Sequence, residues 1–309
     1  KKHLFAVPNS EILSMPSLDR RTFLGSTPAV AGITAFAGVA TPNDTLDQLP
    51  GKTPHTKFAA NIEMWWTKLP LLERIRKASS MGFPAVEFWP WQNKDIDAIT
   101  ALVEELDITI AQFTAWGFRP GLNNPDHHND FCDAIEQGCQ IAKRLNCKKM
   151  TVVGGDDQPG MTQLEMHQNI VDGLRKGAPI AEQHDIMLIL EPMNIRVDHK
   201  GHCLYGSIPA IRICEAVNSS HVKINWDLYH LQITEGDLCG HLREGIDWVG
   251  YLQLADHPGR FEPGTGEIHY NRVLKEAYEL GYRDFVGVEC RPQVNEWTAA
   301  TKLSQADQW

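Results

Sequence analysis

The sequence predicts an α/β protein in which eight parallel strands, each followed by a helix, close into a (β/α)8 barrel. Short apolar runs alternate with helix-like segments along most of the 309 residues. Four of the later runs end in a carboxylic acid or an amide, and the length suits one barrel of ~250 residues with an extension. In this fold all the carboxyl ends of the strands open onto one face, where the active site lies.

The strand candidates are apolar runs whose spacing of roughly 20–40 residues matches right-handed strand–helix–strand units. In chain order they are 57–63, 84–89, 108–113, 147–153, 186–191, 221–227, 248–254 and 284–289. Apolar residues at helical spacing predict helices at 71–82, 97–107, 129–146 and 270–281, and a short final helix around 295–305. Several of these patterns end in Gly or Asn, as helices commonly do. A doubly wound open sheet is the alternative, but it usually has a glycine-rich first turn, and none is visible.

The amino-acid composition limits the kinds of molecule that the protein is expected to bind. Hydrophobic residues make up 42% and charged residues 22%, which is ordinary for a soluble globular enzyme. The formal net charge is −10, and the first 40 residues contribute +2, so the remainder carries −12. An acidic body argues against nucleic acid or an anionic membrane as a partner. The oligomeric state stays open, and a homo-oligomer is compatible with the sequence.

The seven cysteines give no disulfide or zinc-site pattern. They are dispersed, without a C-x-x-C pair, at positions 132, 139, 147, 203, 214, 239 and 290. Most are therefore expected in the core or in strands, and strand alternation predicts that Cys290 points away from the barrel interior.

The first forty residues are expected to be a targeting signal and not part of the fold. Paired arginines in SLDRRTFL (17–24), a weakly apolar Ala- and Gly-rich segment and small residues near position 40 resemble a twin-arginine export signal. We therefore expect a signal at 1–40, a linker at 41–56 and the barrel at 57–309, with the protein exported to a periplasmic or other extracytoplasmic site. The apolar segment is too short for a stable membrane span. The alternative is a disordered leader in which Arg20 and Arg21 are adjacent by chance.

Four polar residues at strand ends form the candidate site. Glu191 ends IMLILE, Asp227 ends VKINWD, Gln253 lies in VGYLQL and Glu289 follows FVGV. Three carboxylates and an amide converging at one barrel mouth would repel one another without a cation between them. Because all the ligand atoms are oxygens, one Mg2+ or Mn2+ is expected, whereas zinc would prefer histidine or cysteine. For any single glutamate, an ion pair with a loop arginine is an equally common explanation.

Glu191 and Glu289 suit proton transfer as well as metal binding. They come from the fifth and eighth strands, so they should face each other across the barrel mouth. With a metal polarising a carbonyl and holding the enediolate, one glutamate would remove a proton and the other would return it to the neighbouring carbon.

These blocks also resemble a known family. LEPMN, DLYHLQITEGDL, YLQLADHPGRFEPGTGEIHYNRVL and GVECRPQ are similar to the hydroxypyruvate isomerase branch of the xylose isomerase-like (sugar phosphate isomerase/epimerase) TIM barrels, from about FAANIEMWW (58–66) and AVEFWPW (85–91) to Pro292. The resemblance implies the interconversion of hydroxypyruvate and tartronate semialdehyde. It matches the four polar residues to metal ligands, and Glu191 and Glu289 to the paired acid and base.

Two further residues are candidates for substrate binding. On the resemblance, His230 corresponds to a substrate-binding histidine, and its alternative is a surface loop position. Arg260, seven residues after Gln253, suits a clamp on a carboxylate or on sugar hydroxyls. Its alternative is an ion pair with Glu262 or Glu267 that only shapes the loop, and Glu267 is expected to hold the loop and not to touch substrate.

Five tryptophans near the ends of the first three strands suit an apolar wall against a sugar, although loop packing is expected for at least half of them: Trp65, Trp66, Trp89, Trp91 and Trp116. This cluster departs from a dedicated hydroxypyruvate enzyme, so the substrate is a small hydroxy-carbonyl acid or a sugar. A ketose 3-epimerase or a keto-sugar or inosose dehydratase would share the metal and the glutamates. An endonuclease-IV-like phosphodiesterase would need a histidine-rich zinc set that the second and third strand ends do not supply. A non-catalytic exported carbohydrate-binding barrel would not require two such glutamates.

Overall fold

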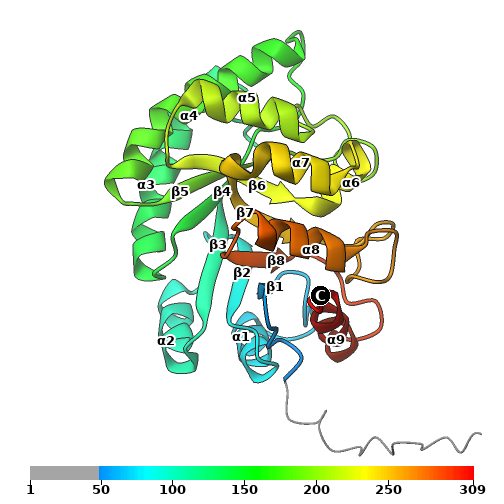
Figure 1. Cartoon of the computed structure of the whole chain (residues 1–309). Helices are drawn as coiled ribbons and strands as arrows, with labels where there is room; N and C mark the ends of the chain where they lie inside the picture. Colours follow the sequence, from blue (N-terminus) through cyan, green and yellow to red (C-terminus); the bar gives the residue numbers. More distant parts are fainter. Residues whose placement is uncertain (1–48) are drawn as a thin grey trace, which may run out of the picture. The chain divides into compact units, whose positions relative to one another are not determined.

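A computed structural model describes residues 49–309, in which eight parallel strands form a closed barrel in sequence order (Figure 1). Each strand pairs with the next, and β1 pairs with β8. The fold class and all eight strand predictions are confirmed. The strands are β1 Lys57–Asn61, β2 Ala85–Pro90, β3 Thr109–Trp116, β4 Lys149–Val153, β5 Met187–Glu191, β6 Val222–Asp227, β7 Val249–Leu254 and β8 Phe285–Val288.

Helices surround the barrel (Figure 1). The predicted helices are present. Three of them are followed by the Gly or Asn that was expected to end the helix, one residue after the C-cap. These residues, Gly82, Asn146 and Gly281, all have positive φ, at 87°, 48° and 95°. The helices are α1 Leu71–Ser80, α2 Ile96–Leu106, α3 His128–Arg144, α4 Gln163–Gln183, α5 Ser207–Val217, α6 Leu228–Thr234, α7 Leu238–Gly245, α8 Tyr270–Glu279 and α9 Glu296–Ala306, with short 3-10 turns η1 Pro125–His127 and η2 Ile246–Trp248.

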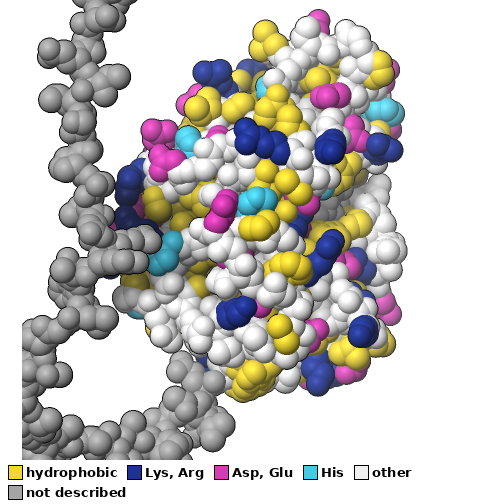
Figure 2. All heavy atoms as spheres, turned by 90° about the vertical axis from the view of Figure 1, so that its right-hand side faces the viewer, with side chains coloured by type: hydrophobic (Ala, Val, Ile, Leu, Met, Phe, Trp, Pro, Cys, Tyr) yellow, Lys and Arg dark blue, Asp and Glu magenta, His cyan; other side chains and the backbone are white. Residues whose placement is uncertain are grey.

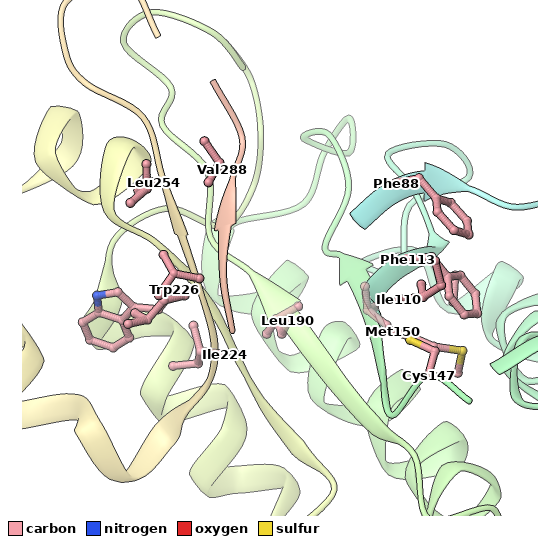
Figure 3. Packing of buried hydrophobic residues seen from close by; sticks show 14 of the residues in the cluster. Phe88, Ile110, Phe113, Cys147, Met150, Leu190, Ile224, Trp226, Leu254 and Val288 are labelled. Carbon is pink, nitrogen blue, oxygen red and sulfur yellow. The ribbon is translucent and has the colours of Figure 1, made fainter. Parts of the chain in front are cut away.

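The apolar core has two layers, because strand side chains alternate between the barrel interior and the helices. The large outer layer lies between strands and helices, and Figure 3 shows part of it. Phe88 of β2 and Phe113 of β3 stack there with ring centroids 5.7 Å apart. The inner layer is small and consists of Ala59, Ala85, Ala111, Ile189 and Tyr251.

The cysteines follow the sequence-based expectation. All seven are free, and five of them are buried. Cys290 belongs to the outer apolar layer, as strand alternation predicted. The cysteines therefore act as small apolar residues and not as cross-links.

A register shift in β3 changes which of its side chains face inward. Val86 of β2 pairs with Ile110, but Phe88, two residues later, pairs with Phe113 three residues later, so β3 contains one extra residue. Such bulges re-aim side chains near the rims of barrels. Here the shift places Gln112 beside the interior of β2, where its Nε2 donates to Glu87 Oε2 at 3.2 Å.

The two ends of the described chain meet at the closure between β1 and β8. Asp307, after α9, is fully buried and accepts hydrogen bonds from the backbone N–H groups of His55 (2.8 Å) and Thr56 (3.1 Å). Gly51 N donates to Met81 O at 2.8 Å, so residues 49–56 of the expected linker contact the barrel. The expected signal at 1–40 and the rest of the linker lie outside the described residues.

The described surface carries mixed charge. On the face shown in Figure 2, basic side chains are interspersed with acidic and uncharged ones and form no stripe. No helix among residues 49–309 has the length and apolar character needed to span a bilayer.

Candidate active site

The four predicted site residues lie at the carboxyl ends of their strands. Glu191 and Asp227 are the last residues of β5 and β6, Glu289 directly follows β8, and Gln253 is the penultimate residue of β7. All four are buried, with 6% or less of each residue exposed. Parallel strands bring these ends to one face of the barrel, so the sequence-based placement is confirmed.

Three of the four residues converge, and a histidine joins them. Glu191, Asp227, His230 and Glu289 each offer one ligand-type atom, and these atoms all lie within 4.8 Å of one another. His230 Nε2 is 3.5 Å from Asp227 Oδ2 and 3.9 Å from Glu191 Oε1. His230 is fully buried, so the surface-loop alternative for this residue is wrong. A group of this size is compatible with one cation.

Gln253, the fourth predicted residue, forms its hydrogen bonds below the group of Glu191, Asp227, His230 and Glu289. It pairs with Asp227 in the sheet register, but its Nε2 donates to Glu87 Oε1 at 2.9 Å. Its Oε1 accepts from Asn225 Nδ2 at 2.6 Å. Gln253 thus links the carboxylate cluster to a buried polar network below it.

Glu87 is the hub of that network, and the sequence analysis did not single it out. Besides Gln253 and Gln112, its carboxylate accepts from Asn61 Nδ2 at 2.9 Å and from the Tyr251 hydroxyl at 2.8 Å. Four donors compensate much of the cost of burying this charge. The available signal was an acid inside the apolar run AVEFWP of β2.

The loop after β7 holds Arg260 over the cluster. Arg260 NH2 is 2.5 Å from Glu289 Oε2 and 3.6 Å from Asp227 Oδ2, and its guanidinium lies 5.1 Å from the Tyr229 ring centroid. The predicted alternative, an ion pair with Glu262 or Glu267, is wrong. The loop adopts a left-handed backbone conformation at Arg260, with φ of 57°, and the Arg260 side chain contacts Glu289 and Asp227 instead.

Neighbouring loop residues show where those two acids go instead. Glu262 pairs with Lys302 at 3.1 Å, whereas exposed Glu267 accepts from Gln232 at 3.1 Å and does not line the cavity. Asp256 organises the loop by accepting hydrogen bonds from the backbone N–H groups of residues 257, 264, 265, 266 and 268. This fully buried carboxylate fixes the turn that carries Arg260.

Asn194 sets the proton position on His230. Asn194 Oδ1 accepts from the backbone N–H groups of Val197 (3.0 Å) and Asp198 (3.1 Å), which fixes the orientation of the amide. Asn194 Nδ2 therefore donates to Asp198 Oδ2 at 2.8 Å and to His230 Nδ1 at 2.7 Å. Since Nδ1 accepts, the neutral ring carries its proton on Nε2, the atom that faces the carboxylates. Asn194 is the last residue of the LEPMN block, but its role was not apparent from the sequence.

Burial dominates the electrostatics of the cluster. It raises the pKa of Glu191 well above the ordinary value, and the negative charges of Glu289 and Asp227 add to the effect. Burial also raises the pKa of Asp227 to about 7, although nearby Arg260 opposes the shift. The pKa of His230 is lowered well below the ordinary value, first by burial and then by Arg260, so this ring is neutral at pH 7. Carboxyl groups in such a site compete for protons or for a cation.

A cavity of about 660 Å3 opens above the cluster. Its floor includes Glu191, His230, Arg260 and Glu289. Of the five tryptophans, Trp89 and Trp116 line it, and Trp89 Nε1 donates to Glu289 Oε1 at 2.7 Å. The other three, Trp65, Trp66 and Trp91, belong to the outer apolar layer or pack against it, as expected for at least half of the set.

Comparisons with known proteins agree with the barrel fold. Residues 75–306 match the family described as xylose isomerase-like TIM barrel. The chain is 32% identical to hydroxypyruvate isomerase of Escherichia coli over 77% of its own length and 94% of the relative. It is 29% identical to 2-oxo-tetronate isomerase of Cupriavidus necator, over 77% and 93% of the two chains. Among solved structures, an AP endonuclease, family 2, from Brucella melitensis superposes with a TM-score of 0.77 at 26% identity and covers 81% of this chain and 98% of its own.

Proposed function

This chain belongs to the xylose isomerase-like TIM barrel family, and on that premise we propose that it is a divalent-cation-dependent isomerase of the hydroxypyruvate isomerase type. The observation that carries the proposal is the convergence of Glu191, Asp227 and Glu289 beneath a cavity. Both curated relatives described above are named as isomerases, which supports the reaction class.

The residues proposed to hold the cation are Glu191, Asp227, Gln253 and Glu289. Asp227 Oδ2 is buried and has no hydrogen-bond partner within residues 49–309, although Arg260 NH2 lies 3.6 Å away, so its lone pairs are free to bind a cation. Gln253 pairs with Asp227 in the sheet register, and its Oε1, which also accepts from Asn225 Nδ2 at 2.6 Å, would supply an uncharged oxygen. An all-oxygen set favours Mg2+ or Mn2+. When bound, such a cation stabilises negative charge on a substrate oxygen.

His230 is proposed to bind substrate and not the cation. A metal ligand must offer a lone pair, but the Asn194 hydrogen bond leaves Nε2 as an N–H donor. His230 lines the cavity, and its Nε2 has no hydrogen-bond partner among the described residues. It is therefore placed to donate to a carbonyl or hydroxyl oxygen of the substrate.

Glu191 and Glu289 are proposed to move the proton. One carboxylate removes the hydrogen from a hydroxyl-bearing carbon, the C–H electron pair becomes the double bond of an enediolate, and the carbonyl electron pair moves to its oxygen. The other carboxyl group then delivers a proton to the former carbonyl carbon. Transfer of the hydroxyl proton to the neighbouring oxygen completes the isomerisation, so no external reductant or oxidant is needed. Arg260 holds Glu289 in position and faces the cavity, where it can also contact substrate oxygens.

Other activities are less well supported by the site. An endonuclease-like site would need several histidines, whereas the ligand-type cluster found among residues 49–309 contains one, and β2 and β3 end in Pro90 and Trp116. A binding protein without catalysis would not require two carboxylates facing one cavity. An epimerase or dehydratase of keto-sugars would use the same groups, so the position of the transferred proton must separate these reactions.

We also propose export by the twin-arginine pathway. The support is the sequence alone, since Arg20 and Arg21 lie outside the described residues. That pathway moves folded proteins, which is compatible with seven free cysteines.

Turnover in D2O tests the proposed function. Mn2+-loaded protein is mixed with hydroxypyruvate, a four-carbon 2-oxo acid and a panel of ketoses, and proton NMR follows the products. We expect an isomerised product with solvent deuterium on the former carbonyl carbon. Two results would count against the enediolate route. One is a product that contains no deuterium even when turnover is slow, and the other is no product from any hydroxy-carbonyl compound.

A further inference from the structure

The two tryptophans that line the cavity differ in what their indole N–H groups bind. The N–H of Trp116 is buried and has no hydrogen-bond partner among residues 49–309. The N–H of Trp89 donates to Glu289 Oε1 at 2.7 Å, a short distance typical of a bond to a charged oxygen. Trp89 is also 38% exposed, and it lines the cavity. Its side chain therefore has one edge on Glu289 and a surface open to a ligand.

The fold brings Trp89 and Glu289 together from strands that are not adjacent. β1 lies between them, because it pairs with β2 on one side and with β8 on the other. In β2, Glu87 bonds to groups inside the barrel and Phe88 belongs to the outer apolar layer, so alternation turns Trp89 inward. Trp89 thus reaches past the carboxyl end of β1 to the residue that directly follows β8.

Glu289 receives a hydrogen bond on each of its two carboxylate oxygens. Trp89 donates to Oε1, and Arg260 NH2 donates to Oε2 at 2.5 Å. Arg260 Nε also donates to the backbone oxygen of Glu289 at 3.4 Å. Rotation of the carboxylate about its terminal bond would break both side-chain hydrogen bonds, so its plane has one orientation. The carboxylate of Glu191 differs, since the nearby His230 Nε2 lies 3.9 Å from its Oε1, beyond hydrogen-bond distance.

An indole suits this position because it is a hydrogen-bond donor only. It binds an oxygen of Glu289 but cannot accept the proton that passes through the site, as a histidine could. A ligand that covers the exposed surface of the ring would exclude water from the hydrogen bond and so strengthen it electrostatically. Such positioning matters, since misplacing a reacting group by about 1 Å costs on the order of 100-fold in rate.

We propose that Trp89 is a positioning residue that, together with Arg260, fixes the plane of the Glu289 carboxylate for proton transfer. The proposal rests on the proposed function, in which Glu289 moves a proton. A ring that only packed against the substrate would need no N–H group, whereas this role depends on it. Loss of the N–H should therefore lower kcat more than it raises KM.

The indole N–H allows a test that does not require turnover. The full chain is labelled with 15N in its indole groups and studied by proton–nitrogen NMR. The signals of Trp89 and Trp297 are identified by their loss in Trp89→Phe and Trp297→Phe. We expect the Trp89 proton to lie downfield of that of Trp297, which is 58% exposed on α9, and to move upfield in Glu289→Gln, whose acceptor is uncharged. An unmoved Trp89 signal in Glu289→Gln would overturn the contact.

Steady-state kinetics at saturating Mn2+ separate the N–H group from the ring. Trp89→Phe removes the N–H but keeps a flat ring at a partly exposed position, so the barrel should fold. We expect kcat to fall roughly 10-fold or more, the scale of a hydrogen bond to a charged group, with a smaller change in KM. Trp89→Leu also removes the ring, so KM should rise as well. Trp91→Phe is the matched control, because the Trp91 N–H is buried without a partner among residues 49–309 and Trp91 does not line the cavity.

The outcomes distinguish this proposal from the proposed function. The kinetics use hydroxypyruvate, or whichever compound of the D2O panel is turned over fastest. A raised KM with unchanged kcat in Trp89→Phe, or an equal fall of kcat in Trp91→Phe, would overturn the positioning role and leave the isomerase in place. If the parent protein turns over no compound of the panel, the proposed function fails, and the NMR signal alone decides whether Trp89 binds Glu289: a shift in Glu289→Gln supports the contact, and no shift overturns it.

Discussion

The side-chain amide of Asn194 donates to Nδ1 of His230 at 2.7 Å and thereby places the imidazole proton on Nε2. The relationship is directional, because Asn194 Oδ1 already accepts two backbone N–H groups and the amide has one orientation. A loop residue after β5 thus decides whether a buried ring next to Asp227 acts as a donor or as a ligand. Partners of this kind commonly influence a site as strongly as the groups that touch substrate.

We predict that Asn194→Asp moves the proton of His230. A carboxylate at this position would accept from Nδ1–H, so Nε2 would become an acceptor, and turnover should fall roughly 10- to 100-fold. The measurement is 15N NMR of histidine-labelled protein, in which the two tautomers have distinct shifts. Asp198→Asn is the control, because it keeps the Asn194 amide on the ring. An unaltered His230 tautomer in Asn194→Asp would contradict this account.

We predict that Glu191→Gln and Glu289→Gln each lose turnover even at saturating Mn2+. Each change keeps an oxygen ligand and nearly the same volume but removes the base, so kcat should fall ~100-fold or more. Steady-state kinetics across a Mn2+ titration measure this. Gln253→Glu is the control, since it alters charge near the cation without touching the proposed acid and base. If both Gln variants regained full turnover at high Mn2+, the two glutamates would act only as ligands of the cation.

We predict that stabilisation by Mn2+ increases with pH. The pKa values of Asp227 and Glu87 rise to about 7 from ordinary values of 3.8 and 4.5, mainly through burial. Because folding favours their protonated forms, their contribution to the stability of the metal-free protein is present in acid and is lost as pH rises toward 7. A cation bound by Asp227 competes with the proton of that carboxyl group, so it should bind more tightly at pH 8 than at pH 5.5.

Thermal unfolding with and without Mn2+ at the two pH values checks this. At about 100 times Kd, a bound cation adds about 2.7 kcal/mol to the free energy of unfolding. The increase in Tm should therefore be clearly larger at pH 8, and Asp227→Asn should reduce the difference between the two conditions. An equal increase at both pH values would show that these carboxyl groups do not exchange protons for the cation.

We predict that Gly287→Ala destabilises the barrel from within. A Cβ at residue 287 of β8 would lie 2.4 Å from Glu87 Oε2 and 2.9 Å from Gln253 Cγ, in a fully packed region. Displacing this network should lower the free energy of unfolding by about 1–3 kcal/mol. Urea denaturation measures the change. Gly117→Ala, where a Cβ meets nothing within 4 Å, is the control, and equal midpoints for the two variants would argue against a rigid Glu87 hub.

We predict that the arginine pair directs export. Lysine at both Arg20 and Arg21 keeps the charge but removes the paired guanidinium groups, so the precursor should stay in the cytoplasm with its barrel folded. Cell fractionation combined with circular dichroism of the recovered protein decides this. Unchanged export of the double variant would mean that the leader works by another route.

The sequence predicted the barrel well because each buried parallel strand is a continuous apolar run. Glu191, Asp227 and Glu289 were found for the same reason, since a polar residue that ends such a run is easily seen. Glu87 was missed because it lies inside its run and its partners come from other strands. The inward turn of Arg260 depends on a left-handed backbone conformation, and the Asn194–His230 bond depends on a tertiary contact, so neither has a local pattern.

The tryptophans show a second limit of prediction from the sequence. Trp89 and Trp116 line the cavity, whereas Trp65 and Trp66 do not, although all four are aromatic residues near strand ends. Strand alternation and the extra residue in β3 set the side-chain directions of Trp89 in β2 and Trp116 in β3, whereas Trp65 and Trp66 lie in the turn after β1. A one-residue irregularity reverses side-chain direction until a second one restores the register, as happens here between Phe88 and Pro90, and the amino-acid pattern marks neither.

The pairing of β1 with β8, which Asp307 stabilises, also determines when the barrel can close during synthesis of the chain. β1 leaves the ribosome before the other strands, but one of its two neighbours and the carboxylate that caps His55 and Thr56 are made last. In the nascent chain, the sheet therefore stays open, with β1 unpaired on one side, until translation of the barrel is complete. A precursor that crosses a membrane only after folding would have to remain in the cytoplasm through that interval, with access to the cytoplasmic pool of metal ions.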